Sequence, residues 1–152
     1  MYQQLAAEVG AERMHELVAA ADYGNGETGP DVTEFWLRGD VRISPLEQLD
    51  FLEELATGDL PFEPEHQAAV RDILVREQGD DWTWSHKTGT ALSESVTLGW
   101  LVGITSYDDR DWVFALNLDL GPVDDIAGQI DPQVRITLAR DALQLLGALP
   151  AV

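Results

Sequence analysis

The sequence holds one lysine, Lys87, which opens the tripeptide Lys87-Thr88-Gly89 and is followed by Thr90. An ammonium group, a hydroxyl donor and a glycine that lets a ligand approach the backbone are together suited to binding an anion. The tripeptide taken alone is more simply explained as a surface turn. The other eight basic residues are all arginines, and this favours a specific role for Lys87.

Two aromatic segments precede this tripeptide and could contribute to the same site. Tyr23-Gly24-Asn25 follows the first predicted helix, and a helix C-terminal turn explains its glycine and asparagine, because both tolerate a positive φ. That explanation accounts less well for Tyr23. The cluster Phe35-Trp36-Leu37 could equally be part of the hydrophobic core, which is the usual place of such residues.

Arg135 is predicted in the first turn of the last helix, where a cation opposes the helix dipole by about 0.3–1 kcal/mol. A guanidinium group is planar and donates two parallel hydrogen bonds, so a carboxylate ligand would explain its position. An exposed arginine paired with a neighbouring acid such as Asp131 is an equally good interpretation. Both interpretations stay open.

Helical periodicity and capping signals indicate the elements that must position these residues. Helices are predicted over 5–21 with a break near Gly10, from Ser44 to Gly58, over 64–77, and from Asp131-Pro132 through Leu146. Ser44 fits the N-cap of the second helix, with Pro45 at its first position and Glu47 completing a capping box. The apolar faces predicted for the two middle helices consist of Leu46, Leu49, Leu52 and Leu55, and of Ala69, Val70, Ile73 and Leu74.

After residue 79 the apolar period changes to two, which is typical of strands. Strands are predicted over 82–87, 96–106 and 111–119, the last two joined by a hairpin turn at 107–110, while 27–40 is predicted to be an ordered loop. The expected fold class is α+β: helices, then a three-stranded antiparallel sheet, then a C-terminal helix. We expect one domain over 1–152, helical over 1–80, with the sheet and last helix over 81–152.

Composition narrows the possible partners and chemistry. The net charge of -19, from 28 acidic and 9 basic residues, would repel nucleic acid and anionic membranes, so neither is expected as a partner. The absence of cysteine excludes thiolate catalysis and cysteine-based metal sites. The histidines show no ligand spacing, and no metal or cofactor is expected. No signal peptide and no membrane-spanning apolar run is recognisable.

Several ordered motifs resemble one known family. They are 2–10 leading to Tyr23-Gly24-Asn25, Phe35-Trp36-Leu37, the helix start at 43–48, Lys87-Thr88-Gly89 with 99–103, and Phe114-Ala115-Leu116-Asn117. Together they resemble class D serine β-lactamases over nearly the whole chain, and more loosely the penicillin-sensing domains of β-lactam receptors. The resemblance implies β-lactam antibiotics as ligands and an exported parent protein.

The resemblance also implies a role for each site residue. Lys87 and Thr88 would line the cleft beside Gly89 and face the β-lactam carboxylate and the acylating serine. The backbone at Thr90 would supply one donor of the oxyanion hole. The remaining implied roles are a Trp36 indole directed at a carbamylated lysine that acts as general base, Tyr23 at the cleft border, and Arg135 as the clamp on the substrate carboxylate.

The nucleophile of that family is absent from this sequence. Its serine stands in a Ser-x-x-Lys pair whose lysine is also the general base, yet Trp84 lies three residues before Lys87. We expect that pair, and the family's Ser-x-Val motif, to precede Met1. Losing the nucleophile of a serine hydrolase costs on the order of 10⁴–10⁶ in rate. The chain is therefore predicted to hold the substrate-binding half and to lack hydrolysis by itself.

Three interpretations remain: a β-lactamase fragment, a penicillin-sensing receptor domain, or a catalytically inert remnant. The sheet is expected to be incomplete, and an unpaired edge favours association. Possible partners are therefore a complementary N-terminal segment or a second copy of the chain.

Overall fold

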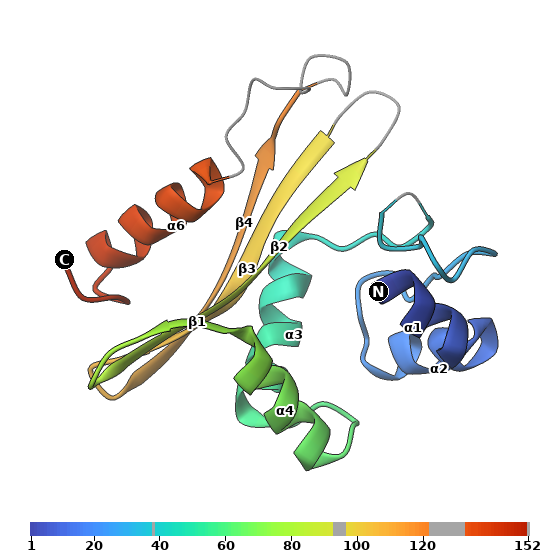
Figure 1. Cartoon of the computed structure of the whole chain (residues 1–152), viewed down its shortest axis with the longest axis horizontal. Helices are drawn as coiled ribbons and strands as arrows, with labels where there is room; N and C mark the ends of the chain where they lie inside the picture. The colour runs from blue at the N-terminus through green and yellow to red at the C-terminus, as the bar shows by residue number, and fades with distance from the viewer. Residues whose placement is uncertain (38, 93–96, 122–132, 152) are drawn as a thin grey trace.

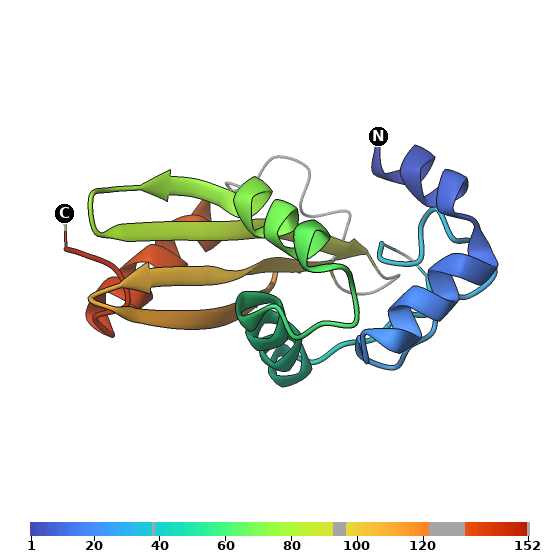
Figure 2. The ribbon, with the colours of Figure 1, turned by 90° about the horizontal axis from the view of Figure 1, so that it is seen from below.

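The structure, a computed structural model, describes residues 1–37, 39–92, 97–121 and 133–151. Its elements are α1 (Tyr2–Val9), α2 (Ala11–Ala20), α3 (Pro45–Thr57), α4 (Pro64–Leu74), β1 (Val75–Gln78), β2 (Trp82–Leu92), β3 (Thr97–Tyr107), β4 (Arg110–Asp119) and α6 (Val134–Leu145). The strands form one antiparallel sheet in the order β1-β2-β3-β4. Helix α6 covers one face, and α3 and α4 lie on the other (Figures 1 and 2). The α+β class is confirmed.

The sheet has four strands, and the prediction of three was wrong. The helix expected to continue to Glu77 ends at Leu74, and Val75–Gln78 form the extra strand β1. This segment pairs with Thr83–Ser85 of β2, with an irregular step between Val75 and Glu77. Arg, Glu and Gln are good helix formers, but helix propensity is a small free-energy preference, and the hydrogen bonds offered by the edge of β2 outweigh it.

The predicted local signals at α3 and at the hairpin are confirmed. The Glu47 N–H donates to Ser44 Oγ at 3.2 Å, and the Ser44 N–H donates to Glu47 Oε2 at 2.6 Å, which completes the capping box. Gly58 ends α3 with a φ of 83°. The β3–β4 turn places Asp108 and Asp109 at φ values of 56° and 58°, as a two-residue primed hairpin turn requires.

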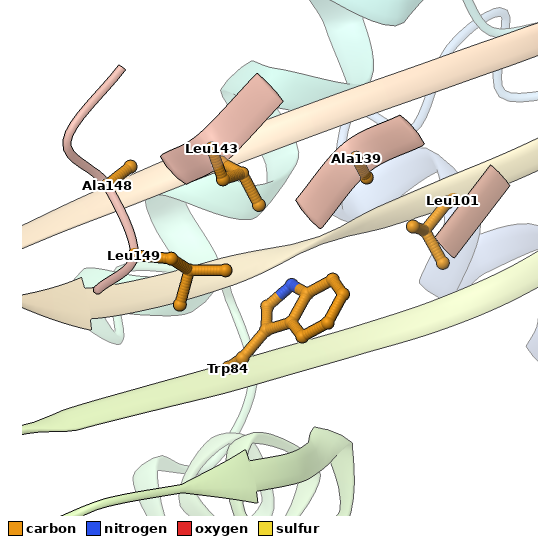
Figure 3. Packing of buried hydrophobic residues seen from close by; sticks show 6 residues of the cluster. All are labelled: Trp84, Leu101, Ala139, Leu143, Ala148 and Leu149. Atoms are coloured by element: carbon orange, nitrogen blue, oxygen red, sulfur yellow. The ribbon is translucent and has the colours of Figure 1, made fainter. Parts of the chain in front are cut away.

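One hydrophobic cluster lies between the sheet and α6. Figure 3 shows Trp84 of β2 with Ala139 and Leu143 of α6 and Leu149 of the C-terminal segment, and all four are buried. Arg140 of α6 lies over the Trp84 ring at 4.3 Å and pairs with Glu77 of β1. These contacts join the last helix to the edge strand that the sequence did not predict.

The other cluster lies between the sheet and α3, and its composition corrects the predicted helix faces. Leu52 and Leu55 are buried as expected, but Leu46 is exposed. In α4 the predicted inward side chains of Val70 and Ile73 are exposed, and Gln67 is buried instead. The Gln67 amide donates at 2.8 Å to the carbonyl oxygens of both Leu60 and Phe62. The buried side chain therefore supplies hydrogen bonds to two backbone carbonyl groups of the turn before α4.

The predicted last helix begins at Val134 in the structure, and its predicted start at Asp131-Pro132 lies outside the described residues. No helix in the described part of the chain has the length and apolar character that crossing a membrane demands.

Candidate ligand site at the open edge of strand β2

Strand β2 has an open edge along the segment that carries the Lys-Thr-Gly tripeptide. On one side, β3 pairs with β2 over its full length, from Trp82 to Leu92. On the other side, β1 pairs only with Thr83–Ser85. Among the described residues, no strand pairs with this second edge between residues 86 and 91. Backbone groups there are available to a ligand that lies along the strand.

Alternation along the strand places the side chains of this segment on opposite faces of the sheet. Thr88 and Thr90 share the face of Trp84, which α6 covers, whereas Lys87 is paired with Val102 on the face toward α3. A ligand at the open edge would therefore meet side chains from both faces.

Arg135, in the first turn of α6, binds directly to this strand. Its Nη1 donates to the Gly89 carbonyl oxygen at 2.5 Å, and it lies 3.4 Å from both Thr90 Oγ1 and the Trp100 carbonyl oxygen. Gly99 makes room for it, because a Cβ at that position would lie 3.3 Å from the same Nη1. The buried Nε of Arg135 has no hydrogen-bond partner in the described part of the chain. Arg135 therefore contacts the tripeptide at Gly89, and its role as a clamp on a substrate carboxylate stays a prediction.

The Arg135 contacts also fix the direction of the backbone groups. Gly89 and Trp100 are opposite each other, and one nitrogen can reach both carbonyl oxygens only if both lie between β2 and β3. In an antiparallel pair, residues directed at the partner strand alternate with residues directed away from it. The N–H and C=O groups of Thr88 and Thr90 therefore point to the open edge.

The Lys87 ammonium reaches the same edge. Its Nζ donates to the Thr88 carbonyl oxygen at 2.5 Å and lies 5.8 Å from the centre of the Tyr2 ring. Partial burial lowers the pKa of Lys87 from its usual value, and the positive charges of Arg76 and Arg135 lower it further. The contribution of Tyr2 was not predicted, although the resemblance included the helix that it begins.

Tyr23 lies in the cluster beside α3. Its hydroxyl donates to Gln48 Oε1 at 2.8 Å, and its ring meets Phe51 edge-on at 4.9 Å. Burial raises the pKa of the Tyr23 phenol. No hydrogen bond or ring contact joins it to Lys87 among the residues that the structure describes. The structure thus shows packing for Tyr23, and its predicted place at the border of a cleft stays a prediction.

The rest of the Tyr-Gly-Asn motif has a clear local function. Asn25 Oδ1 accepts from the Arg42 N–H at 2.9 Å, and the Asn25 N–H donates to the Arg42 carbonyl oxygen at 2.9 Å. Gly24 has a φ of 57°, and a Cβ there would collide with the same carbonyl. The motif therefore connects the end of α2 by hydrogen bonds to the segment that leads into α3.

Trp36 lies in the turn after α2 and meets the ring of buried Phe35 edge-on at 5.1 Å. No contact between Trp36 and the β2 segment is present within the described ranges. Its predicted role, which concerns a lysine that this sequence does not contain, also stays a prediction.

Comparisons with known proteins agree with the resemblance in the sequence. Residues 1–138 match the family model described as the penicillin binding protein transpeptidase domain. The chain is 40% identical over 118 residues to the probable β-lactamase YbxI of Bacillus subtilis, covering 78% of the chain and 44% of that protein. It is 36% identical over 120 residues to the β-lactamase OXA-48 of Klebsiella pneumoniae, covering 79% of the chain and 45% of that protein.

Solved structures give the same result for the fold. A class D β-lactamase YbXI from Nostoc superimposes with a TM-score of 0.85 and 35% identity, over 97% of this chain and 60% of that one. The class D β-lactamase FUS-1 of Fusobacterium nucleatum gives a TM-score of 0.85 and 35% identity over 97% of this chain and 59% of that one. The chain spans about half the length of the curated relatives from Bacillus subtilis and Klebsiella pneumoniae.

Proposed function

The chain belongs to the penicillin binding protein transpeptidase domain family and is related to class D β-lactamases, and we propose that it binds β-lactams at the open edge of β2. The observation that carries the proposal is the convergence of three features at one strand segment. They are the outward backbone groups of Thr88 and Thr90, the Lys87 ammonium and the Arg135 guanidinium.

This arrangement fits the chemistry of a β-lactam. Such a molecule carries a carboxylate, a strained amide carbonyl and commonly a side-chain amide. Extended backbone can pair with the amide groups, as in other cases where a ligand adds to a sheet edge. Two cations approaching the strand from opposite faces can bind the carboxylate, and charge-assisted hydrogen bonds are the strongest of their kind.

We propose further that hydrolysis belongs to a complete parent domain. This sequence contains no Ser-x-x-Lys, so the acylating serine and the general base must come from outside it. With those groups present, the outward N–H of Thr90 is suited to the oxyanion hole, which stabilises the tetrahedral intermediate. Trp36 and Tyr23 would border the same cleft. A complementary N-terminal segment is then the expected partner, and the parent protein would be exported.

A penicillin-sensing receptor domain is the second candidate, because the family model that matches is that of penicillin binding proteins. The two candidates differ in the fate of the acylated serine. A parent domain that hydrolyses its acyl-enzyme within minutes is an enzyme, and one that stays acylated is a sensor. If the chain binds no β-lactam, the inert remnant is the remaining interpretation.

Binding can be tested on the chain itself with ¹⁵N-labelled protein and benzylpenicillin. We expect the amide signals of Thr88 and Thr90 to shift, and Arg135→Gln to weaken binding about 10- to 100-fold, as expected for a lost hydrogen bond to a charged group. Arg13→Gln, a change to an exposed arginine of α2 that pairs with Glu16, is the matched control and should have no effect. Unchanged spectra at millimolar ligand would disprove the proposal.

Catalysis is tested with a chromogenic cephalosporin. The chain alone should give no turnover above the blank. The parent domain, with the segment that supplies Ser-x-x-Lys, should give turnover that a serine-to-alanine change in that segment abolishes. Turnover by the chain alone would contradict the assignment of the nucleophile to another segment.

A further inference from the structure

Lys87 is the one lysine of this chain, and its amine lies at the strand edge where we place the ligand. We propose that Lys87 is itself acylated by β-lactams, so that the chain captures one antibiotic molecule as a stable amide without any serine nucleophile. The inference rests on the proposed function, because it uses the same strand edge, but it assigns this edge a covalent reaction of its own.

The geometry directs the amine toward the ligand. The Thr88 carbonyl points to the open edge, and Lys87 Nζ donates to its oxygen at 2.5 Å. This hydrogen bond uses one N–H of the amine and holds its nitrogen beside the outward groups of Thr88 and Thr90. The Tyr2 ring, 5.8 Å away, limits where the side chain can go. A lactam carbonyl bound along the strand would lie next to a positioned nucleophile.

The positive charges around Lys87 increase the fraction of its amine that is neutral and therefore nucleophilic, and the remaining ammonium fraction is the cation of the proposed carboxylate site. Arg76 of β1 and Arg135 of α6 both lower its pKa, together with partial burial. The Tyr2 ring acts in the opposite direction, since an aromatic face attracts a cation. Within the described residues, no carboxylate lies at ion-pair distance from Lys87 to offset the two arginines. An amine with a lowered pKa is the usual form of a reactive lysine.

The reaction is balanced without any other reactant. The lone pair of Lys87 Nζ attacks the lactam carbonyl carbon and forms a carbon–nitrogen bond. The N–H of Thr90 at the open edge is suited to stabilise the oxyanion that forms. The lactam carbon–nitrogen bond then breaks, and the proton lost by the amine ends on the lactam nitrogen. The product is an amide whose mass exceeds that of the chain by one intact β-lactam.

The test is to incubate the chain with benzylpenicillin and to follow its intact mass. Peptide mapping should place the adduct on Lys87, and hydroxylamine, which cleaves esters, should leave it in place. Lys87→Arg is the matched variant, because it keeps the positive charge and removes the nucleophile. Two internal references are the Met1 α-amine and the chain unfolded in urea. We expect Lys87 in the folded chain to react at least about tenfold faster than in the unfolded chain.

The outcomes separate this inference from the proposed function. Fast acylation of Lys87 in the folded chain, absent in Lys87→Arg, supports the inference. Equal rates in folded and unfolded chain, or an adduct mainly on Met1, overturn it. Shifts of the Thr88 and Thr90 amides in the wild-type chain, with no adduct on Lys87, overturn the inference and leave the binding function standing. If neither amide shifts nor an adduct is observed, both the inference and the proposed function are overturned.

Discussion

Replacing Thr105 by valine should stabilise the protein. Thr105 lies near the C-terminal end of β3 on the face toward α6, between Trp84 of β2 and Trp112 of β4. Its side chain is fully buried, and its Oγ1 has no hydrogen-bond partner among the described residues. Valine has nearly the same shape and favours strands, so the substitution exchanges an unsatisfied hydroxyl for a methyl group without leaving a cavity.

The size of the effect follows from the cost of burying a polar group. An unpartnered buried hydroxyl costs about 1–3 kcal/mol, so Thr105→Val should raise the free energy of unfolding by about that amount. For a chain of this size, each kcal/mol corresponds to roughly 2–4 °C in Tm. Urea unfolding followed by tryptophan fluorescence measures both the midpoint and the slope, and the slope should stay unchanged.

A matched threonine gives the control. Thr33 donates from its Oγ1 to Asp31 at 2.6 Å, so Thr33→Val removes a hydrogen bond that exists and should destabilise slightly. If Thr105→Val lowered the free energy of unfolding by 1 kcal/mol or more, the hydroxyl would have a bound partner such as an ordered water. The reasoning from an unsatisfied group would then be wrong.

Three further predictions concern the cap, the sheet and the pH response. Ser44→Ala removes the capping box of α3 and should cost about 1 kcal/mol of unfolding free energy in urea. Gly103→Ala places a Cβ against the Ser85 carbonyl between paired strands. We expect the free energy of unfolding to fall by about 1–3 kcal/mol, or folding to be prevented, and circular dichroism measures either result. Burial lowers the pKa of His86 below its usual 6.5, the charges of Arg76 and Arg140 add to the effect, and the Glu77 charge opposes it. The unfolded chain therefore binds the proton more readily, so the free energy of unfolding falls as the pH drops below about 6.5. His86→Leu should remove this pH dependence, which urea titrations at pH 7.5 and 5.5 measure. The same pH dependence in His86→Leu would contradict the prediction.

The sequence predicted the features that depend on local interactions. The capping box at Ser44, the break at Gly10 and the hairpin at Asp108 and Asp109 all involve hydrogen bonds or backbone angles within a few residues. The tripeptide at 87–89 was found because its residue types suit an anion and match a family motif. Such signals are visible without knowing what packs against them.

Only the tertiary structure decided the features that depend on distant partners. Residues 75–78 became a strand because the edge of β2 was free to pair with them, which no local preference shows. Gln67 was buried in place of apolar neighbours because two carbonyls of the preceding turn required its amide. The open edge at 86–91 and the contact of Arg135 with Gly89 likewise arise from the end of β1 and the placement of α6. A hydrogen bond across the fold depends on where both partners lie, and the sequence specifies that only through the whole chain.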